Sequence, residues 1–269
     1  MSLPAYAMKT ETFPALYERV LVAALFRPWA EQLLDGIDLT RARSVLDVAC
    51  GTGIAARVAR DRLRGGARIV GVDISEPMLA VARRAAPELD WRQGDAAALP
   101  VAAEERFDVV ICQQGLQFFA ARGAAAGEMR RVLAPGGTVT VATWVASEEA
   151  PLYCDLQRIA ERHVGPVTDQ RHSFGEPRCM EQLLLAAGLV PTTVATVSRV
   201  VRFADPAAFV RMNAMALIGM AQMGEALSDA ARARLLSAIE RESTAATMPF
   251  VEGTELVFET RAIVATARG

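Results

Sequence analysis

The chain has 269 residues and a mass of 28.9 kDa, enough for one large domain or for a domain with a helical annex. Its 52% hydrophobic and 22% charged residues allow a sizeable buried core and exclude a disordered chain. The formal net charge is −2 with both signs interspersed, so the basic surface of a nucleic-acid-binding protein is absent and no nucleic-acid partner is expected.

The first half of the chain alternates predicted strands with predicted helices. Residues Phe13 to Leu34 carry apolar side chains at helical spacing, which predicts one or two helices. Short apolar runs without strict alternation then follow, as expected for parallel strands covered on both faces. These runs are Ser44–Ala49, Arg68–Asp73, Leu89–Gln93, Phe107–Cys112 and Thr138–Thr143. Helices are predicted near Ile54–Leu63, Pro77–Ala86 and Ala124–Leu133, the last ending in a Pro135-Gly136-Gly137 stop signal.

The second half has a different rhythm. It contains two more predicted strands, Thr192–Phe203 and Glu255–Ala267. Helices are predicted over Pro151–His163, Arg178–Ala187, Asp205 to about Met223, and Ser228–Glu242, with a loop over Asp169–Pro177. The whole pattern predicts an α/β fold with a doubly wound, mostly parallel seven-stranded sheet. We expect one domain: an N-terminal helical cap (1–40), a cofactor-binding core (41–145), and further core strands with helical lid insertions (146–269, the lids near 151–176 and 205–245).

The rarer residue types limit the chemistry. The four cysteines are widely spaced and form no Cys-x-x-Cys pair, which speaks against disulfides or a zinc site, and no metal is expected. Only two histidines are present, His163 and His172. Residues 1–12 lack the charged start and apolar core of a signal peptide, and no apolar run reaches the length of a membrane span. We therefore expect a cytoplasmic protein without a membrane span.

The clearest local motif is a predicted strand that runs into a glycine turn and then a helix, Val45-Leu46-Asp47-Val48-Ala49-Cys50-Gly51-Thr52-Gly53. Glycines permit close approach of a ligand to the backbone, and the start of the helix offers free N–H groups. The next strand ends at Asp73, where a carboxylate can accept hydrogen bonds from a ribose. These features also fit a nicotinamide-dinucleotide site, so a dehydrogenase remains an alternative.

Three further features favour a ligand other than a nicotinamide dinucleotide. Asp47 lies where dinucleotide-binding proteins usually have an apolar residue, and its carboxylate suits a cationic amino group better than a pyrophosphate, although it can also simply bind turn amides. Asp95, in Gly94-Asp95-Ala96 after the third strand, can accept from an adenine amino group. After the fourth strand come Gln113-Gln114-Gly115-Leu116-Gln117 and, later, Arg131-Val132-Leu133-Ala134-Pro135-Gly136-Gly137.

In this order, VLDVACGTG, GVDIS, GDA and RVLAPGG resemble the motifs of class I S-adenosylmethionine-dependent methyltransferases, specifically the small-molecule branch that includes the ubiquinone and menaquinone enzymes. The resemblance covers Tyr17 to Trp144 closely and the remainder loosely. It implies a Rossmann-like fold, S-adenosylmethionine as cofactor and S-adenosylhomocysteine as product. One departure is Ala49, where the family often has glycine.

The resemblance also implies cofactor-binding residues. Asp47, Ala49, Gly51 and Gly53 would surround the methionine part, together with Gln113, and Asp73 would bind the ribose. Ile74 and Met78 would pack against the adenine, which Asp95 and Ala96 would hold at its edge. Tyr17 would lie on a helix that closes over the cofactor.

The acceptor is expected to be an apolar or aromatic small molecule, such as a natural-product intermediate of secondary metabolism or a quinone precursor, methylated on oxygen, nitrogen or carbon. Met212 and Met215, on a methionine-rich helix, would wall an apolar cavity with Gln114, Gln117 and Trp144 at its floor, although helical core packing also explains the methionines. His172 is the candidate general base, with a structural role as the alternative. A protein of this fold that binds the cofactor but catalyses a non-methyl reaction is the other hypothesis. A homodimer is possible.

Overall fold

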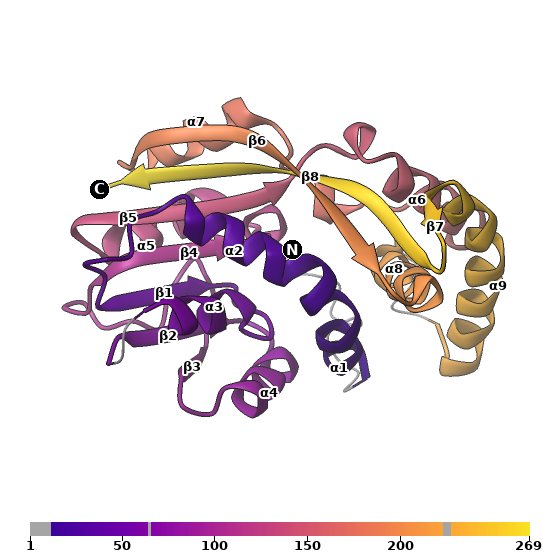
Figure 1. The fold of residues 1–269 in the computed structure, drawn as a ribbon, viewed down its shortest axis with the longest axis horizontal. Coiled ribbons are helices and arrows are strands. Elements are labelled where there is room, and N and C mark those ends of the chain that lie inside the picture. Colours follow the sequence, from indigo (N-terminus) through magenta and orange to yellow (C-terminus); the bar gives the residue numbers. More distant parts are fainter. Residues whose placement is uncertain (1–11, 64–65, 223–226) are drawn as a thin grey trace.

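The computed structural model describes residues 12–63, 66–222 and 227–269. Its central sheet follows the order β3-β2-β1-β4-β5-β8-β6, and β7 pairs with β8 outside this path (Figure 1). The strands are β1 (Ser44–Val48), β2 (Arg68–Asp73), β3 (Asp90–Gln93), β4 (Phe107–Gln113), β5 (Leu133–Trp144), β6 (Val190–Phe203), β7 (Val251–Glu252) and β8 (Glu255–Arg268). β1 to β5 pair in parallel, while β8 is antiparallel to its neighbours.

The predicted mostly parallel, doubly wound α/β sheet is confirmed, but the predicted count of seven strands is wrong, because there are eight. The additional strand, β7, has two residues and folds back on the start of β8 through a turn with Gly253 at φ +62°. A two-residue strand shows no period that a sequence pattern can reveal. The motif Pro135-Gly136-Gly137 lies within β5, where the pairing with β4 shifts register, rather than at a helix end.

Helices cover both faces of the sheet. α2 (Arg27–Asp35), α3 (Ile54–Arg62) and α4 (Glu76–Ala85) contribute buried side chains to the apolar cluster on one face, and α5 (Arg122–Arg131) and α7 (Pro177–Ala186) do so on the other. Adjacent residues of β1 show the split, since Val45 belongs to the first cluster and Leu46 to the second. This is the alternation expected for a strand buried on both sides.

The chain enters the fold as one continuous helical run, α1 (Thr12–Tyr17), a π-helical segment η1 (Glu18–Phe26) and α2. The indole nitrogen of Trp29 donates to the hydroxyl of Thr260 on β8 at 3.1 Å, which fixes α2 on the sheet. Phe26 and Trp29 both pack against Trp144 at the end of β5. These contacts hold η1 above the carboxyl ends of the parallel strands.

The remaining helices gather at one end of β6 and β8 (Figure 1). Trp144, the last residue of β5, pairs with Ala262, so the segments 198–203 and 256–261 pair with each other beyond the end of β5. Around this extension lie α6 (Pro151–Val164), α8 (Pro206–Met220) and α9 (Asp229–Thr247). Phe203, Phe209 and Phe258 form an aromatic cluster there. Met223, which we expected to end the helix now seen as α8, lies outside the described residues.

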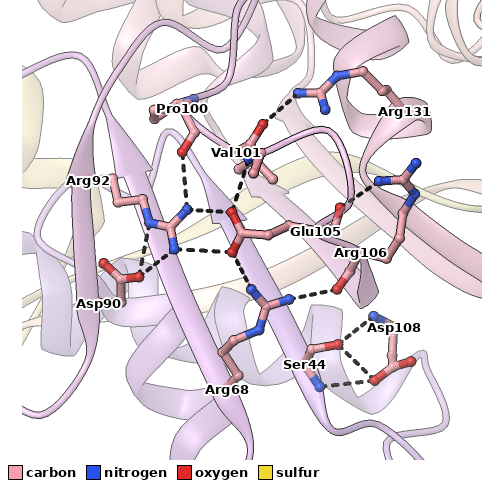
Figure 2. Close-up of polar contacts among 11 residues, drawn as sticks. Ser44, Arg68, Asp90, Arg92, Pro100, Val101, Glu105, Arg106, Asp108 and Arg131 are labelled. Carbon is pink, nitrogen blue, oxygen red and sulfur yellow. Dashed lines mark hydrogen bonds and ion pairs between the residues drawn. The ribbon is translucent and has the colours of Figure 1, made fainter.

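A network of ion pairs closes the opposite edge of the sheet, at the amino ends of the parallel strands (Figure 2). Glu105, in the loop before β4, pairs with Arg68 and with Arg92, and Arg92 also binds Asp90. Asp108 accepts from the backbone and hydroxyl of Ser44, which joins β4 to β1. These contacts are far from the strand ends that carry the predicted site, so they stabilise the fold.

Candidate active site

A cavity of about 390 Å³ lies at the carboxyl ends of β1, β2 and β4, where the strand order reverses between β1 and β4. Ligands of open α/β sheets bind at this position. Segments η1, α4, α6 and α8 enclose the cavity together with a short helical turn, η4 (Gln170–His172). Most of the predicted cofactor residues line it, namely Tyr17, Asp47, Ala49, Gly51, Asp73, Ile74, Met78, Asp95, Ala96 and Gln113.

The turn between β1 and α3 needs its glycines for different reasons. Ala49, Gly51 and Gly53 all have positive φ, of +56°, +56° and +84°. A Cβ on Gly51 would meet no atom within 4 Å, so this backbone is open for a ligand. A Cβ on Gly53 would lie 2.2 Å from the ring of Trp91. Gly53 does not line the cavity, and glycine is required there because Trp91 packs against its backbone.

Asp47 is 1% exposed and faces the cavity from the end of β1. Its Oδ2 accepts from the backbone N–H of Ala56 in the first turn of α3 at 2.9 Å. Oδ1 has no hydrogen-bond partner among the described residues. Burial, together with a smaller contribution from the nearby Asp73, raises the pKa of the Asp47 carboxyl to about 7. A carboxylate so placed gains from a cation in the cavity.

Asp73 ends β2 and joins three segments of the site. One oxygen accepts from the N–H of Gly51 at 2.7 Å, and the other accepts from the N–H of Ser75 at 2.8 Å. Ser75 in turn caps α4 by accepting from Met78. Burial raises the pKa of the Asp73 carboxyl. Asp73 is therefore both a helix-entry carboxylate and a cavity-lining one.

The adenine-binding residues that we predicted surround one end of the cavity. Ile74 is 49% exposed and Met78 is buried, and both line the cavity. Asp95 accepts from the N–H of Ala97 at 2.8 Å through Oδ1. Tyr17, the last residue of α1, lines the cavity and stacks on Phe26 of η1 with ring centroids 4.9 Å apart.

Gln113 ends β4, Gln114 and Gln117 follow it, and the three glutamines have different environments. Gln113 donates from Nε2 to the carbonyl of Phe26 at 2.8 Å, while its Oε1 is buried without a partner. Gln114 has φ +47°, is 6% exposed, and lines the cavity with neither carboxamide atom hydrogen-bonded. Gln117 is also buried with an unpartnered carboxamide, but it does not line the cavity. Gln114 is thus a buried polar group that a ligand can satisfy.

A buried ion pair that no sequence motif indicates, Arg171 with Asp169, lies at the cavity wall. Arg171 and Asp169 have side chains 15% and 3% exposed, and they are joined through Nη2 and Oδ2 at 2.6 Å. Nη1 of Arg171 donates to Oδ1 of Asn213 at 2.7 Å. The guanidinium also lies over the ring of Tyr153, 5.2 Å from its centroid. Arg171, Asn213 and Tyr153 line the cavity.

His172 is next to this pair and also lines the cavity. Its Nδ1 is 2.7 Å from the carbonyl oxygen of Val145. Because a carbonyl only accepts, Nδ1 carries the proton and Nε2 of the neutral ring is free to accept one. Burial and the charge of Arg171 lower the pKa of His172. The loop predicted over Asp169–Pro177 therefore contains a short helical turn that holds His172 in place.

Helix α8 supplies the apolar wall. Met212 packs with Phe13 and Met78 in a small cluster of its own, which joins α8 to α1 and α4. Met212 and Trp144 line the cavity, whereas Met215 packs beside them outside it. Phe209 and Met220 of the same methionine-rich helix also line the cavity, and other apolar lining residues were not predicted: Phe13, Leu21, Leu25, Phe26, Phe118 and Phe119. Their helical spacing indicates buried faces, yet nothing in that spacing tells a cavity wall from a core.

Known proteins resemble this chain chiefly over the core of the sheet. Residues 45–137 match the methyltransferase domain family. The 2-phytyl-1,4-naphtoquinone methyltransferase of Thermosynechococcus vestitus is 33% identical over 137 residues, which cover 49% of this chain and 60% of that protein. The nocamycin O-methyltransferase of Saccharothrix syringae is 30% identical over 188 residues, 61% of this chain and 65% of that protein. The chain thus spans less than two thirds of the length of these curated relatives.

The fold has solved counterparts as well. Phosphoethanolamine N-methyltransferase 2 of Haemonchus contortus, a structure that contains S-adenosyl-L-methionine, superposes on all of this chain and 60% of its own length with a TM-score of 0.60 and 17% identity. At this identity the likeness concerns the fold. Residues 45–137 of this chain therefore match a methyltransferase domain, and the fold around them is shared with a solved methyltransferase.

Proposed function

We propose that the protein transfers a methyl group from S-adenosylmethionine to an apolar or aromatic small molecule. The observation that carries this proposal is the pairing of two environments in one cavity. At one end two buried carboxylates, Asp47 and Asp73, accept hydrogen bonds only from backbone N–H groups and form no ion pair within the described residues. The same cavity is lined over much of its remaining wall by aromatic and methionine side chains.

The residues at the first end fit this cofactor. Its methionine part carries an ammonium group and its sulfur a positive charge, and both gain from carboxylates that have no protein cation beside them. A pyrophosphate would be repelled by the same carboxylates, which disfavours the dinucleotide alternative. The open backbone at Gly51 and the cavity volume of about 390 Å³ suit a ligand of nucleoside size.

The chemistry then requires little from the protein beyond placement. When bound, the cofactor supplies a methyl group on a sulfonium, which is already activated for displacement. The β1–α3 turn and Asp73 would hold it, while η1 and α8 would exclude water from the methyl group. Gln114 would donate to, or accept from, a polar group of the acceptor. Where the nucleophile arrives protonated, Nε2 of His172 would receive its proton.

This proposal assigns roles to the parts of the chain. The N-terminal cap (1–40), which contains α1, η1 and α2, would close over the cofactor. Residues 41–145 would bind it, and the insertions near 151–176 and 205–245 would select the acceptor within one domain. The expected partner is a small molecule. Within the described part of the chain, no helix combines the length and apolarity that crossing a bilayer requires, and no group of three or more His, Cys, Asp or Glu side chains is arranged to hold a metal ion.

Calorimetry with the intact protein tests the cofactor assignment. We expect S-adenosylhomocysteine to bind with a micromolar Kd and NADH not to bind. A second experiment separates methyl transfer from other chemistry on this fold. The protein is incubated with methyl-labelled S-adenosylmethionine and an extract of small molecules, and label should appear in an organic product together with S-adenosylhomocysteine. A rearranged product without S-adenosylhomocysteine would favour the non-methyl hypothesis instead.

A further inference from the structure

In one part of the cavity wall, side chains from α6, η4 and α8 contact one another: Arg171 contacts Tyr153 and Asn213, and Tyr153 contacts His172. We call this part the acceptor end and define it by Tyr153, Arg171, His172, Phe209 and Asn213. Arg171 is the one arginine or lysine among the described residues that line the cavity. Apart from it, the acceptor end presents aromatic rings, a neutral imidazole and a carboxamide. A ligand with an anionic oxygen therefore has a single place to bind here.

The guanidinium of Arg171 is held in place by hydrogen bonds, but not all of its N–H donors are used. Its Nε and Nη2 bind the carboxylate of Asp169, and Nη1 binds Asn213, whose own Nδ2 donates to the carbonyl of Phe209. These contacts use three of the five N–H bonds of a guanidinium, which leaves one donor on each Nη. Because the side chain lines the cavity, the remaining donors are within reach of a bound molecule.

A neighbouring arginine shows what a purely structural role looks like in this region. Arg122 donates to the backbone carbonyls of Leu116 and Gln117 and to the hydroxyl of Ser173, and it does not line the cavity. Arg171 instead lines the cavity and makes its contacts with the side chains of Asp169 and Asn213, which fix the plane of the guanidinium and leave one N–H on each Nη. The ion pair with Asp169 stabilises the buried guanidinium when no ligand is bound.

We propose that Arg171 binds the reacting oxygen of the acceptor as an anion, so that the acceptor is an apolar molecule with an acidic oxygen, methylated on that oxygen. This inference rests on the proposed function. The acceptor oxygen forms a bond to the methyl carbon, the carbon–sulfur bond breaks with its electron pair left on sulfur, and the positive sulfonium becomes a neutral thioether. The negative charge of the oxygen is consumed in the same step.

The titratable groups around the acceptor end agree with an acidic oxygen. They are Arg171 and Asp169, His172 and Tyr153, with Glu148 acting on His172 from a greater distance. His172 can accept a proton at Nε2, but Arg171 and burial lower its pKa. Such a weak base removes a proton only from an acidic group. Burial raises the pKa of Tyr153 to about 12, so its phenol stays neutral and does not compete as an anion.

The test uses 4-nitrophenol as a probe, because its phenolate absorbs visible light and its phenol does not. The full-length protein is saturated with S-adenosylhomocysteine, and the probe is titrated at a pH where most of it is protonated in solution. We expect the bound probe to show the phenolate band. The acidic oxygen could belong to a carboxylate instead of a phenolate, so benzoate is tested as a competitor of 4-nitrophenol. Nitrobenzene, which has no acidic oxygen, should bind at least tenfold more weakly than 4-nitrophenol.

Substitutions test whether the phenolate band of the bound probe depends on Arg171. Arg171→Gln should weaken phenolate binding roughly tenfold or more and Arg171→Lys less, with the affinity for S-adenosylhomocysteine unchanged. Since Arg171→Gln leaves Asp169 unpaired, the double variant Asp169→Asn/Arg171→Gln removes both charges. Arg122→Gln is the matched control and should keep the band. A probe bound as the neutral phenol, or not bound, or bound equally by the double variant, would overturn the inference. If S-adenosylhomocysteine itself does not bind, the proposed function fails instead.

Discussion

The carboxylate of Asp73 lies 2.7 Å from the backbone nitrogen of Gly51 and accepts its hydrogen bond. This contact joins the end of β2 to the glycine turn after β1, the two segments that sequence patterns alone assign to one ligand. Asp73 also holds the N–H of Ser75, so its carboxylate organises the turn, the entry to α4 and one wall of the cavity.

We expect Asp73→Ala to weaken S-adenosylhomocysteine binding by more than tenfold in calorimetry. The same variant leaves two backbone donors without their acceptor, which should lower the free energy of unfolding by about 1–3 kcal/mol. Glu76→Gln is the control, because Glu76 lies in the next turn of chain and pairs with Arg83 at the surface. Equal affinities for the wild type and Asp73→Ala would remove Asp73 from the cofactor site.

Asp47 should make cofactor binding depend on pH. With a pKa raised to about 7 by burial, its carboxyl is about half protonated at neutral pH in the ligand-free protein. A cationic ligand favours the ionised form, so binding should release a proton, and affinity should rise as the pH increases from about 6 to 8. Calorimetry in buffers of different ionisation enthalpy measures the released proton directly. In Asp47→Asn the release should disappear, and an unchanged release would assign the proton to another group.

The same shift gives Asp47 a defined effect on the stability of the ligand-free protein. The pKa of the Asp47 carboxyl is about 7 in the folded protein and about 3.9 in the unfolded chain. Its contribution to the free energy of unfolding is therefore fully present below about pH 3.9 and is lost as the pH rises through about 7. Asp47→Asn removes the effect. Denaturant unfolding at pH 5 and pH 8 should therefore show that the variant gains stability relative to the wild type at the higher pH.

His172→Ala should lower turnover far more than it lowers affinity for S-adenosylhomocysteine. A positioned base contributes roughly 10²-fold or more, and His172 lines the cavity at the acceptor end. His163→Ala is the matched control, since His163 lies on α6 and binds Glu242 at the surface. Turnover is measured with an acceptor found by the labelling experiment. A rate unchanged in His172→Ala would show that the acceptor needs no protein base.

We expect Glu105 to make the stability of the fold depend on pH at the acid end. Arg92 lowers the pKa of its carboxyl to about 2, so its contribution is present above the unfolded pKa of about 4.3 and is lost as pH falls through about 2. The side chain is partly exposed, so solvent screening limits the effect, and Glu105→Gln should cost about 0.5–1 kcal/mol at pH 7. Glu104→Gln, on the exposed neighbour, should cost less than about 0.5 kcal/mol. Equal unfolding curves for the two variants would show that the network in Figure 2 does not stabilise the sheet.

The sheet was largely predictable because each parallel strand is a short apolar run bounded by turn residues. Val45 to Val48 and Val109 to Cys112 show this, and both lie buried in the centre of the sheet. Strand β7 is too short to be predicted from a sequence pattern, because it consists of Val251 and Glu252 paired with the start of β8. The start of β5 was missed for a similar reason, as Pro135 and its glycines look like a turn although Leu133 already pairs with Phe107.

The candidate site divides in the same way. Residues in the glycine turn and at strand ends, such as Gly51 and Asp73, have a geometry dictated by local sequence, and the structure brings them to one cavity. Tyr153 and Arg171 reach that cavity only through tertiary contacts: Tyr153 packs against Phe258 of β8, and Arg171 binds Asn213 of α8. No local pattern encodes such tertiary contacts. Arg171 follows the Asp169 cap of a short helical turn, a feature that from sequence indicates a turn and nothing more.

The binding of S-adenosylhomocysteine, measured by calorimetry on the wild type beside NADH, tests the central claim most directly. The proposed site requires S-adenosylhomocysteine to bind in the micromolar range with release of a proton near neutral pH, and NADH not to bind. Binding of NADH without binding of S-adenosylhomocysteine would contradict the proposal that this protein is a methyltransferase.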